Sequence, residues 1–197
     1  NVHAFSDVVM LAAMDFRSNR ISLISLSRDT MCEFQRLNPD GTERDRAYGQ
    51  LALAFSYGEG KEKSCEITKD AVSRIMSELP IRSCSALYLY GLRALNDAVG
   101  GGRVTHIDDK LIRRAAEENT TVPELAERYI RARERTPQGN LNRMERQKQY
   151  VKALMKKAME QIKKNPESIL DIYNSIKNEV VTDSSSRSPA SSMSYCT

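Results

Sequence analysis

The apolar run from Val8 to Met14 constrains the fold more than any other feature of the sequence. At seven residues it is far shorter than the roughly 20 apolar residues that a membrane-spanning helix needs. After a polar stretch, residues 21–26 partly alternate apolar and polar side chains, as a strand with one exposed face does. We therefore predict a β-hairpin whose first strand is buried on both faces.

Most of the remaining chain has apolar residues at helical spacing. One further strand is predicted at residues 86–90, and Asn38 to Gly41 is predicted to be a turn within a polar loop. The alternation of strands and helices predicts an α/β protein. The predicted helices cover residues 51–57, 64–79, 92–99, 122–135, 141–162 and 166–180.

Length and composition predict one compact domain. The chain has 197 residues, of which 40% are hydrophobic and 28% charged, so it can bury a core and is not wholly disordered. We assign residues 1–181 to this domain and residues 182–197, which are rich in serine, to a disordered tail. The chain starts with Asn1, almost directly before the first predicted strand, which suggests that a leader, an anchor or an earlier strand precedes it.

Positive charge is concentrated in the second half of the chain. The net charge is +4, and residues 128–164 hold twelve Lys or Arg but only the three acids Glu134, Glu145 and Glu160. Such a stretch suits a polyanion such as nucleic acid, an acidic polymer or a phosphorylated lipid. For Lys148 to Lys164 the simpler interpretation, a solvated helix face, is favoured. A nucleic-acid-binding module is disfavoured, because aromatic residues for base stacking are not interleaved with the arginines.

The four cysteines lack the paired spacing of a structural zinc site. They are Cys32, Cys65, Cys84 and Cys196. A disulfide between Cys65 and Cys84 is one interpretation if the protein faces an oxidising compartment, and buried free thiols are the favoured one.

Three polar clusters are candidates for chemistry. Asp7 opens the first predicted strand, where a carboxylate can hold a cation or act as a base, although it is more often a turn residue. Arg28 and Asp29 follow the second strand, as a simple salt bridge or as part of a site. The third cluster is rich in arginine, whose planar guanidinium groups suit a bidentate grip on phosphate. It comprises Arg131, Arg133, Arg143, Arg146 and Gln147, of which the last three share one helical face.

Together and in this order, the clusters resemble the LytR-CpsA-Psr family of cell-wall glycopolymer transferases. The resemblance runs from about Ser6 to Leu154. It rests on Ser6-Asp7, Arg28-Asp29-Thr30, Ala54-Phe55-Ser56-Tyr57-Gly58, Asp97-Ala98-Val99-Gly100-Gly101, Arg131-x-Arg133 and Arg143-x-x-Arg146-Gln147.

The resemblance implies a fold, a reaction and a location. The fold is a three-layer α/β/α arrangement with a central mixed β-sheet and a helical C-terminal part. The reaction is the transfer of a glycopolymer, such as teichoic acid or capsule polysaccharide, from a polyprenyl-pyrophosphate carrier onto peptidoglycan. Members lie on the outer face of the membrane of mainly Gram-positive bacteria, held by a membrane segment that this sequence does not include.

The same resemblance implies residue roles. Asp7 would bind the Mg²⁺ that bridges the pyrophosphate, and Gln147 would support the head group. The catalytic positions would be Arg28, Asp29 and Asn140. The pyrophosphate would be bound by Arg28, Arg131, Arg133, Arg143 and Arg146.

The chain also departs from the family pattern. Asn140 stands where Asp is usual, Phe5 where Arg is common, and Gln50 and Ala52 where a Lys-x-Asn sequence is frequent. The loss of a carboxylate at position 140 removes a possible base or metal-supporting group. The alternative function is therefore that of a non-catalytic relative that binds polyprenyl phosphate or wall polyanions.

Overall fold

The computed structural model describes residues 5–99, 130–131, 136 and 138–183. Its contacts divide the chain into two compact units. Unit 1 comprises Asn1–Asp7, Arg28–Ala86 and Val181–Thr197, and unit 2 comprises Val8–Ser27 and Leu87–Val180. Each unit is thus built from segments that lie far apart in the sequence.

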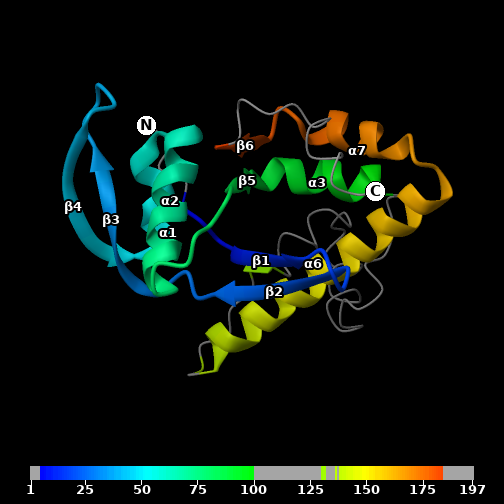
Figure 1. The fold of residues 1–197 in the computed structure, drawn as a ribbon, viewed down its shortest axis with the longest axis horizontal. Helices are drawn as coiled ribbons and strands as arrows, with labels where there is room; N and C mark the ends of the chain where they lie inside the picture. The colour runs from blue at the N-terminus through cyan, green and yellow to red at the C-terminus, as the bar shows by residue number, and fades with distance from the viewer. Residues whose placement is uncertain (1–4, 100–129, 132–135, 137, 184–197) are drawn as a thin grey trace, which may run out of the picture. The chain divides into compact units, whose positions relative to one another are not determined.

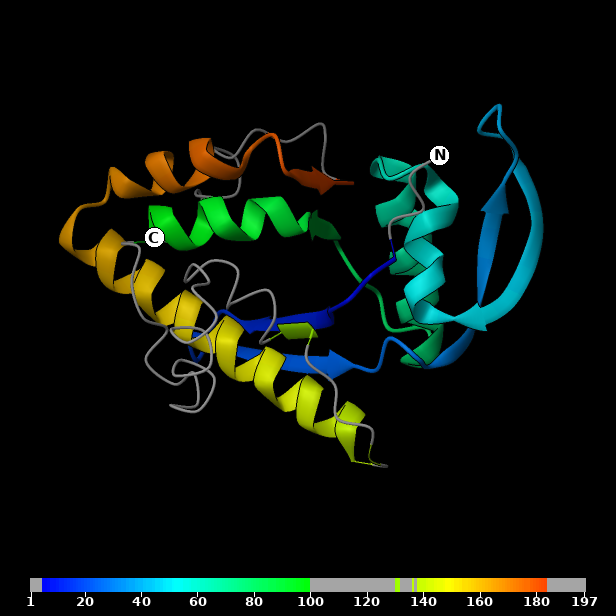
Figure 2. The same cartoon turned by 180° about the vertical axis from the view of Figure 1, so that it is seen from behind.

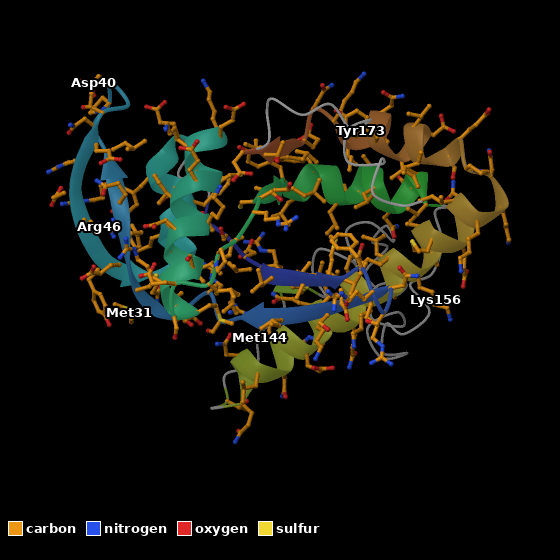
Figure 3. The ribbon with its side chains drawn as sticks, viewed as in Figure 1. Met31, Asp40, Arg46, Met144, Lys156 and Tyr173 are labelled. Atoms are coloured by element: carbon orange, nitrogen blue, oxygen red, sulfur yellow. The ribbon has the colours of Figure 1, made fainter. Side chains whose placement is uncertain are left out.

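Unit 1 contains a β-hairpin that the sequence did not predict. Strands β3 (Met31–Leu37) and β4 (Glu43–Gln50) pair antiparallel, with a register shift between Gln35 and Leu37. The predicted turn forms the tip, where the side chain of Asp40 accepts hydrogen bonds from the amide and hydroxyl of Thr42. Figure 3 shows Asp40 at this end of the hairpin. The expected polar loop is wrong beyond the turn, because the residues before it alternate between exposed and buried from Met31 to Phe34, as those of a strand do.

The helices of unit 1 cover one face of this hairpin (Figure 1). The predicted short helix is confirmed as α1 (Leu51–Ala54) followed by the 3-10 helix η1 (Phe55–Gly58), and α2 spans Glu62–Ile75. The side chains of Phe34, Leu51, Cys65 and Ala71 are at most 1% exposed and form the core of the unit. Gly58 permits the tight approach of α2, since a Cβ there would lie 2.1 Å from the backbone nitrogen of Ser64.

Unit 2 begins with the hairpin that the sequence predicted. Strands β1 (Val9–Asp15) and β2 (Arg20–Leu26) pair antiparallel from Val9 opposite Leu26 to Asp15 opposite Arg20. At the turn, the Asp15 side chain accepts hydrogen bonds from the Arg17 amide at 2.9 Å and the Ser18 hydroxyl at 2.6 Å. The expectation that the first strand is buried on both faces is wrong, because its second half is exposed.

Three helices complete the described part of unit 2. They are α3 (Leu89–Ala98), α6 (Gly139–Lys164) and α7 (Ser168–Ile176), and α3 and α7 lie side by side in both views (Figures 1 and 2). The long helix α6 confirms the one predicted at 141–162. The core of the unit is Val99, Ile130, Tyr150 and Leu154.

A third two-stranded sheet joins β5 (Ser85–Leu87) to β6 (Val180–Thr182). The strand predicted at 86–90 is thus shorter than expected. The last helix, predicted at 166–180, ends at Ile176, and Val180 is already the first residue of β6. The mixed α/β class is confirmed. Among the described residues, however, the strands pair two by two and not in one central mixed sheet.

Two sequence predictions concern segments that are only partly described. The helix predicted at 122–135 lies outside the described residues apart from Ile130 and Arg131, and the predicted tail does so from residue 184 onward. In the part of the chain that the structure describes, none of the helices combines the length and the apolar character needed to cross a membrane.

Candidate functional site

Asp7 and Arg28 form an ion pair in unit 1. Their side chains are 25% and 22% exposed, so the pair is largely shielded from water without being sealed off. The antiparallel register explains the pairing, because continuing it two residues past Val9 and Leu26 puts Asp7 opposite Arg28. The first two clusters predicted from the sequence are therefore one cluster.

The backbone around this pair is held by the start of α1. The Ser6 amide donates to the Ala52 carbonyl at 3.1 Å, and the Ala52 amide donates to the Arg28 carbonyl at 2.9 Å. The Leu51 amide donates to the Thr30 carbonyl at 2.8 Å. Both segments that carry the ion pair are thus anchored to one buried turn, which fixes the position of the carboxylate and the guanidinium.

Asn140 links two elements of unit 2. Its side-chain nitrogen Nδ2 donates to the Ser27 hydroxyl at 2.9 Å, and its oxygen Oδ1 accepts from Nη2 of Arg143 at 2.7 Å. Asn140 and Arg143 are one helical turn apart at the beginning of α6, and Ser27 follows β2. The amide therefore orients the Arg143 guanidinium relative to the end of the hairpin.

Arg143 and Gln147 are buried, with only 8% and 4% of their surface exposed. The Gln147 side chain donates from Nε2 to the carbonyl oxygen of Ile130 at 3.1 Å. It thereby holds the backbone next to Arg131, whose side chain is exposed. The predicted helical face of Arg143, Arg146 and Gln147 is present. Burying the charge of Arg143 costs free energy unless the guanidinium contacts anionic or polar groups.

The exposed side of α6 differs from the face that carries Arg143, Arg146 and Gln147. Lys156 and Met144 mark positions along this helix in Figure 3. Lys152, Lys156 and Lys163 are exposed, which fits the interpretation of the lysine-rich stretch as a solvated helix face.

The predicted site residues fall into two groups. Asp7, Arg28 and Asp29 belong to unit 1, whereas Arg131, Asn140, Arg143, Arg146 and Gln147 belong to unit 2. Arg133 lies outside the described residues. That both groups serve one substrate stays a prediction. The sequence places Ser27 directly before Arg28 but indicates no role for it, and the structure shows that its hydroxyl accepts the hydrogen bond from Asn140.

A magnesium ion at Asp7 is implied by the family resemblance, and the donor set allows a test of its fit. The described residues contain no group of three or more His, Cys, Asp or Glu able to hold a metal by themselves. Mg²⁺, however, commonly uses one or two carboxylates and takes its other ligands from water and substrate phosphates. A single carboxylate at Asp7 fits an ion that arrives with a pyrophosphate.

A family model described as the LytR_cpsA_psr family matches residues 1–195. No curated protein sequence matches the chain significantly.

Solved structures show the same fold at low sequence identity. Protein gbs0355 from Streptococcus agalactiae has a TM-score of 0.72 and 22% identity, with 98% of this chain and 64% of that chain covered. TagU of B. subtilis has a TM-score of 0.57 and 18% identity, with 90% of this chain and 71% of that chain covered. TagV of B. subtilis has a TM-score of 0.58 and 20% identity, with 91% of this chain and 66% of that chain covered. The chain therefore spans slightly less than two thirds of the streptococcal protein.

Proposed function

This chain belongs to the LytR-CpsA-Psr family, a family of cell-wall glycopolymer transferases, and from that premise we propose a specific reaction. The protein moves a glycopolymer from a polyprenyl-pyrophosphate carrier onto peptidoglycan. The observation that supports this most directly is the buried Arg143, which Asn140 orients through a 2.7 Å hydrogen bond. An oriented, poorly hydrated guanidinium is a strong ligand for a phosphate oxygen.

The arginines bind and neutralise the pyrophosphate. Within unit 2, Arg143 and Arg146 present guanidinium groups from α6, and Arg131 contributes a third. Arg28, in unit 1, is a fourth arginine that we assign to the same pyrophosphate. Phosphoryl transfer is catalysed mainly by positioning and by charge stabilisation, so a cluster of fixed cations lowers its barrier. Because Arg28 is paired with Asp7, it is held in place before the substrate arrives.

Asp7 would hold a Mg²⁺ ion together with the pyrophosphate oxygens. When bound, the ion supplies further neutralisation of the charge that develops on the phosphates. The chain's own contribution is the carboxylate and its fixed position beside Arg28.

In the transfer itself, a sugar hydroxyl of the acceptor attacks the phosphorus that carries the glycopolymer. The new P–O bond to the acceptor forms as the bridging P–O bond breaks, and polyprenyl monophosphate leaves. Asp29 is the carboxylate that we assign to accept the proton of the attacking hydroxyl. Asn140 has no basic group, so its role is to position Arg143 and not to take the proton.

A turnover assay with a short prenyl pyrophosphate and Mg²⁺ tests this proposal. Replacing a phosphate-binding arginine removes a charge-assisted hydrogen bond, so Arg28→Gln and Arg143→Gln should each lower phosphate release roughly 10- to 100-fold. Arg44→Gln is the matched control, because Arg44 lies on β4 with its side chain 58% exposed, and its turnover should equal that of the parent. Equal turnover in all four proteins would refute the site assignment.

A second function is favoured by one observation, the amide at position 140. A relative that binds polyprenyl phosphate or wall polyanions without transferring them needs the arginines but not a catalytic carboxylate. The same assay separates the two functions. Binding of the prenyl pyrophosphate with no turnover in any form would assign the protein as a binder.

We also propose the location that family membership supports, the extracytoplasmic face of the membrane and the cell wall of a Gram-positive-type bacterium. Peptidoglycan and the lipid-linked glycan would be its partners there. Labelling of intact cells with a reagent that does not cross the membrane tests this, because only a protein on the outer face reacts.

A further inference from the structure

Two cysteines of unit 1 are held against the same short strand. Cys65, in α2, is completely buried, and its Sγ lies 3.5 Å from the carbonyl oxygen of Val181 in β6. Cys84 directly precedes β5 and is half-buried. Its carbonyl oxygen accepts hydrogen bonds from the Thr182 hydroxyl at 3.1 Å and from the Asp183 amide at 3.2 Å.

The two thiols also interact with each other. A hydrogen bond between their sulfur atoms raises the pKa of Cys65 and lowers the pKa of Cys84, so Cys84 is the thiol that ionises first. Lys69 lowers the pKa of Cys84 further, although burial and the charge of Asp183 oppose this. Val181, Thr182 and Asp183 hold both residues, so the two thiols belong to one cluster, and a disulfide between them needs a sulfur–sulfur distance of about 2.05 Å.

Cys65, Cys84 and Cys32 are all free thiols in the structure. Cys32 is buried elsewhere, in β3, and its pKa is raised by burial alone. It therefore has the properties of a structural thiol, whereas the other two differ in exposure and in acidity as the members of a reactive pair do.

We propose that Cys65 and Cys84 are a thiol–disulfide exchange site, with Cys84 the attacking sulfur and Cys65 the resolving one. The oxidant is a disulfide, either a small molecule such as oxidised glutathione or the disulfide of an oxidoreductase. The Cys84 thiolate attacks one sulfur of the oxidant, forms a mixed disulfide and expels the first thiol. Cys65 then loses its proton, attacks Cys84 Sγ and expels the second thiol, so that two electrons pass to the oxidant.

The resulting bond would fix α2 to the segment that leads into β5. It closes a ring from residue 65 to residue 84, which includes all of α2 except its first three residues. Closing a ring of this size restricts the unfolded chain and stabilises the folded one. The oxidised protein should melt about 5 to 10 °C higher than the reduced protein.

Peptide mapping of the full chain tests the bond directly. The reduced protein is incubated with oxidised glutathione, its remaining thiols are alkylated, and trypsin then releases Cys65 in residues 64–69 and Cys84 in residues 83–93. We expect these two peptides to be joined, while Cys32 is recovered alkylated. Recovery of both peptides unlinked, or linkage of Cys84 to Cys196, would overturn the proposal.

Single substitutions test the order of attack. Cys65→Ser should accumulate a glutathione adduct on Cys84, because the resolving thiol is missing. Cys84→Ser should leave Cys65 unmodified as long as the protein is folded, because that thiol is fully buried. Cys32→Ser is the control and should form the 65–84 bond at the parent's rate.

A measurement on the parent protein keeps the test valid if a variant does not fold. Brief alkylation of the reduced parent should modify Cys84 before Cys65, by at least 10-fold in rate, because Cys84 is more acidic and more exposed. Modification of the two thiols at equal rates would refute the assignment of Cys84 as the attacking sulfur.

Discussion

Tyr150 is the residue whose environment most clearly predicts a stability change. It lies in the core of unit 2 at 1% exposure, and its hydroxyl has no hydrogen-bond partner among the described residues. A buried hydroxyl without a partner has lost its bonds to water and gained nothing in exchange. We expect Tyr150→Phe to raise the free energy of unfolding by about 1 kcal/mol, measured by urea denaturation at pH 7. Destabilisation by this change would contradict the description of the site.

The same residue predicts a pH dependence. Burial raises the pKa of Tyr150 to about 12, above the value of about 10 in the unfolded chain. Its contribution to stability is therefore complete below pH 10 and is lost as the pH rises through 12. At pH 11 the loss should be about 1.4 kcal/mol relative to pH 8. The comparison with Tyr150→Phe isolates this effect. Between pH 8 and pH 11, the free energy of unfolding of the variant should fall by about 1.4 kcal/mol less than that of the parent.

Asn140 predicts how the site responds to a restored carboxylate. In Asn140→Asp both hydrogen bonds can persist, because the Ser27 hydroxyl can donate to one carboxylate oxygen while Arg143 donates to the other. The bond to Arg143 becomes charge-assisted on both sides and strengthens. For a transferase, we expect turnover of a prenyl pyrophosphate to rise or stay unchanged. A pure binder would show no turnover and weaker affinity for the anion, so measuring both separates the two.

At the scale of elements, Gly58 predicts the most sensitive contact of unit 1. A methyl group there would meet backbone atoms of α2 at 2.1 to 2.5 Å, and backbone cannot move aside as a side chain does. Gly58→Ala should lower the free energy of unfolding by about 3 kcal/mol or more.

Gly41, at the tip of the β3–β4 hairpin, provides the matched control. A Cβ there has open space around it, but its φ of +81° disfavours any other residue. Gly41→Ala should therefore cost only about 1 kcal/mol. Similar losses at the two positions would show that the approach at Gly58 relaxes easily. Both are measured by urea denaturation.

Elements were predictable from sequence where their signals are local. The β1–β2 hairpin and α6 follow directly from apolar spacing, and so does the face that carries Arg143 and Arg146. Helix α2 was predicted to reach Leu79 but ends at Ile75, because Ser77 and Glu78 adopt left-handed φ angles of 57° and 61°. The Glu78 amide bonds the Ser73 carbonyl in a helix-ending turn without the usual glycine, so no local signal marked it.

At the scale of the whole molecule, the missed features depend on distant partners. Strand β6 is only three residues long, and it forms because it pairs with β5. The Asn140 contact with Ser27 likewise joins residues 113 positions apart. Residue types at the candidate site could be read from the sequence because arginine and aspartate are chemically distinctive. Their grouping into Asp7 with Arg28, and Asn140 with Arg143, required the structure.

Asp183 connects segments that lie far apart in the sequence. Its side chain is 4% exposed, pairs with Lys69 and accepts a hydrogen bond from the Cys84 amide at 2.9 Å. Asp183→Ala leaves the Lys69 charge and that amide without this acceptor, and should cost about 3 kcal/mol. The control Asp45→Ala removes a carboxylate that is 56% exposed beside Arg36, and should cost much less, because an exposed ion pair contributes little to stability. Equal costs in urea denaturation would contradict the burial of Asp183.

The division of the chain into two units also has a consequence for synthesis on the ribosome. The chain passes from one unit to the other after residues 7, 27, 86 and 180, so neither unit is a continuous piece of sequence. The first residues of unit 1 leave the ribosome before any residue of unit 2, while Val181 and Asp183, which bond to Cys65, Lys69 and Cys84, follow the last residue of unit 2. Unit 1 therefore cannot be completed until all of unit 2 has been synthesised, and until then Cys65 and Cys84 lack the strand that holds them.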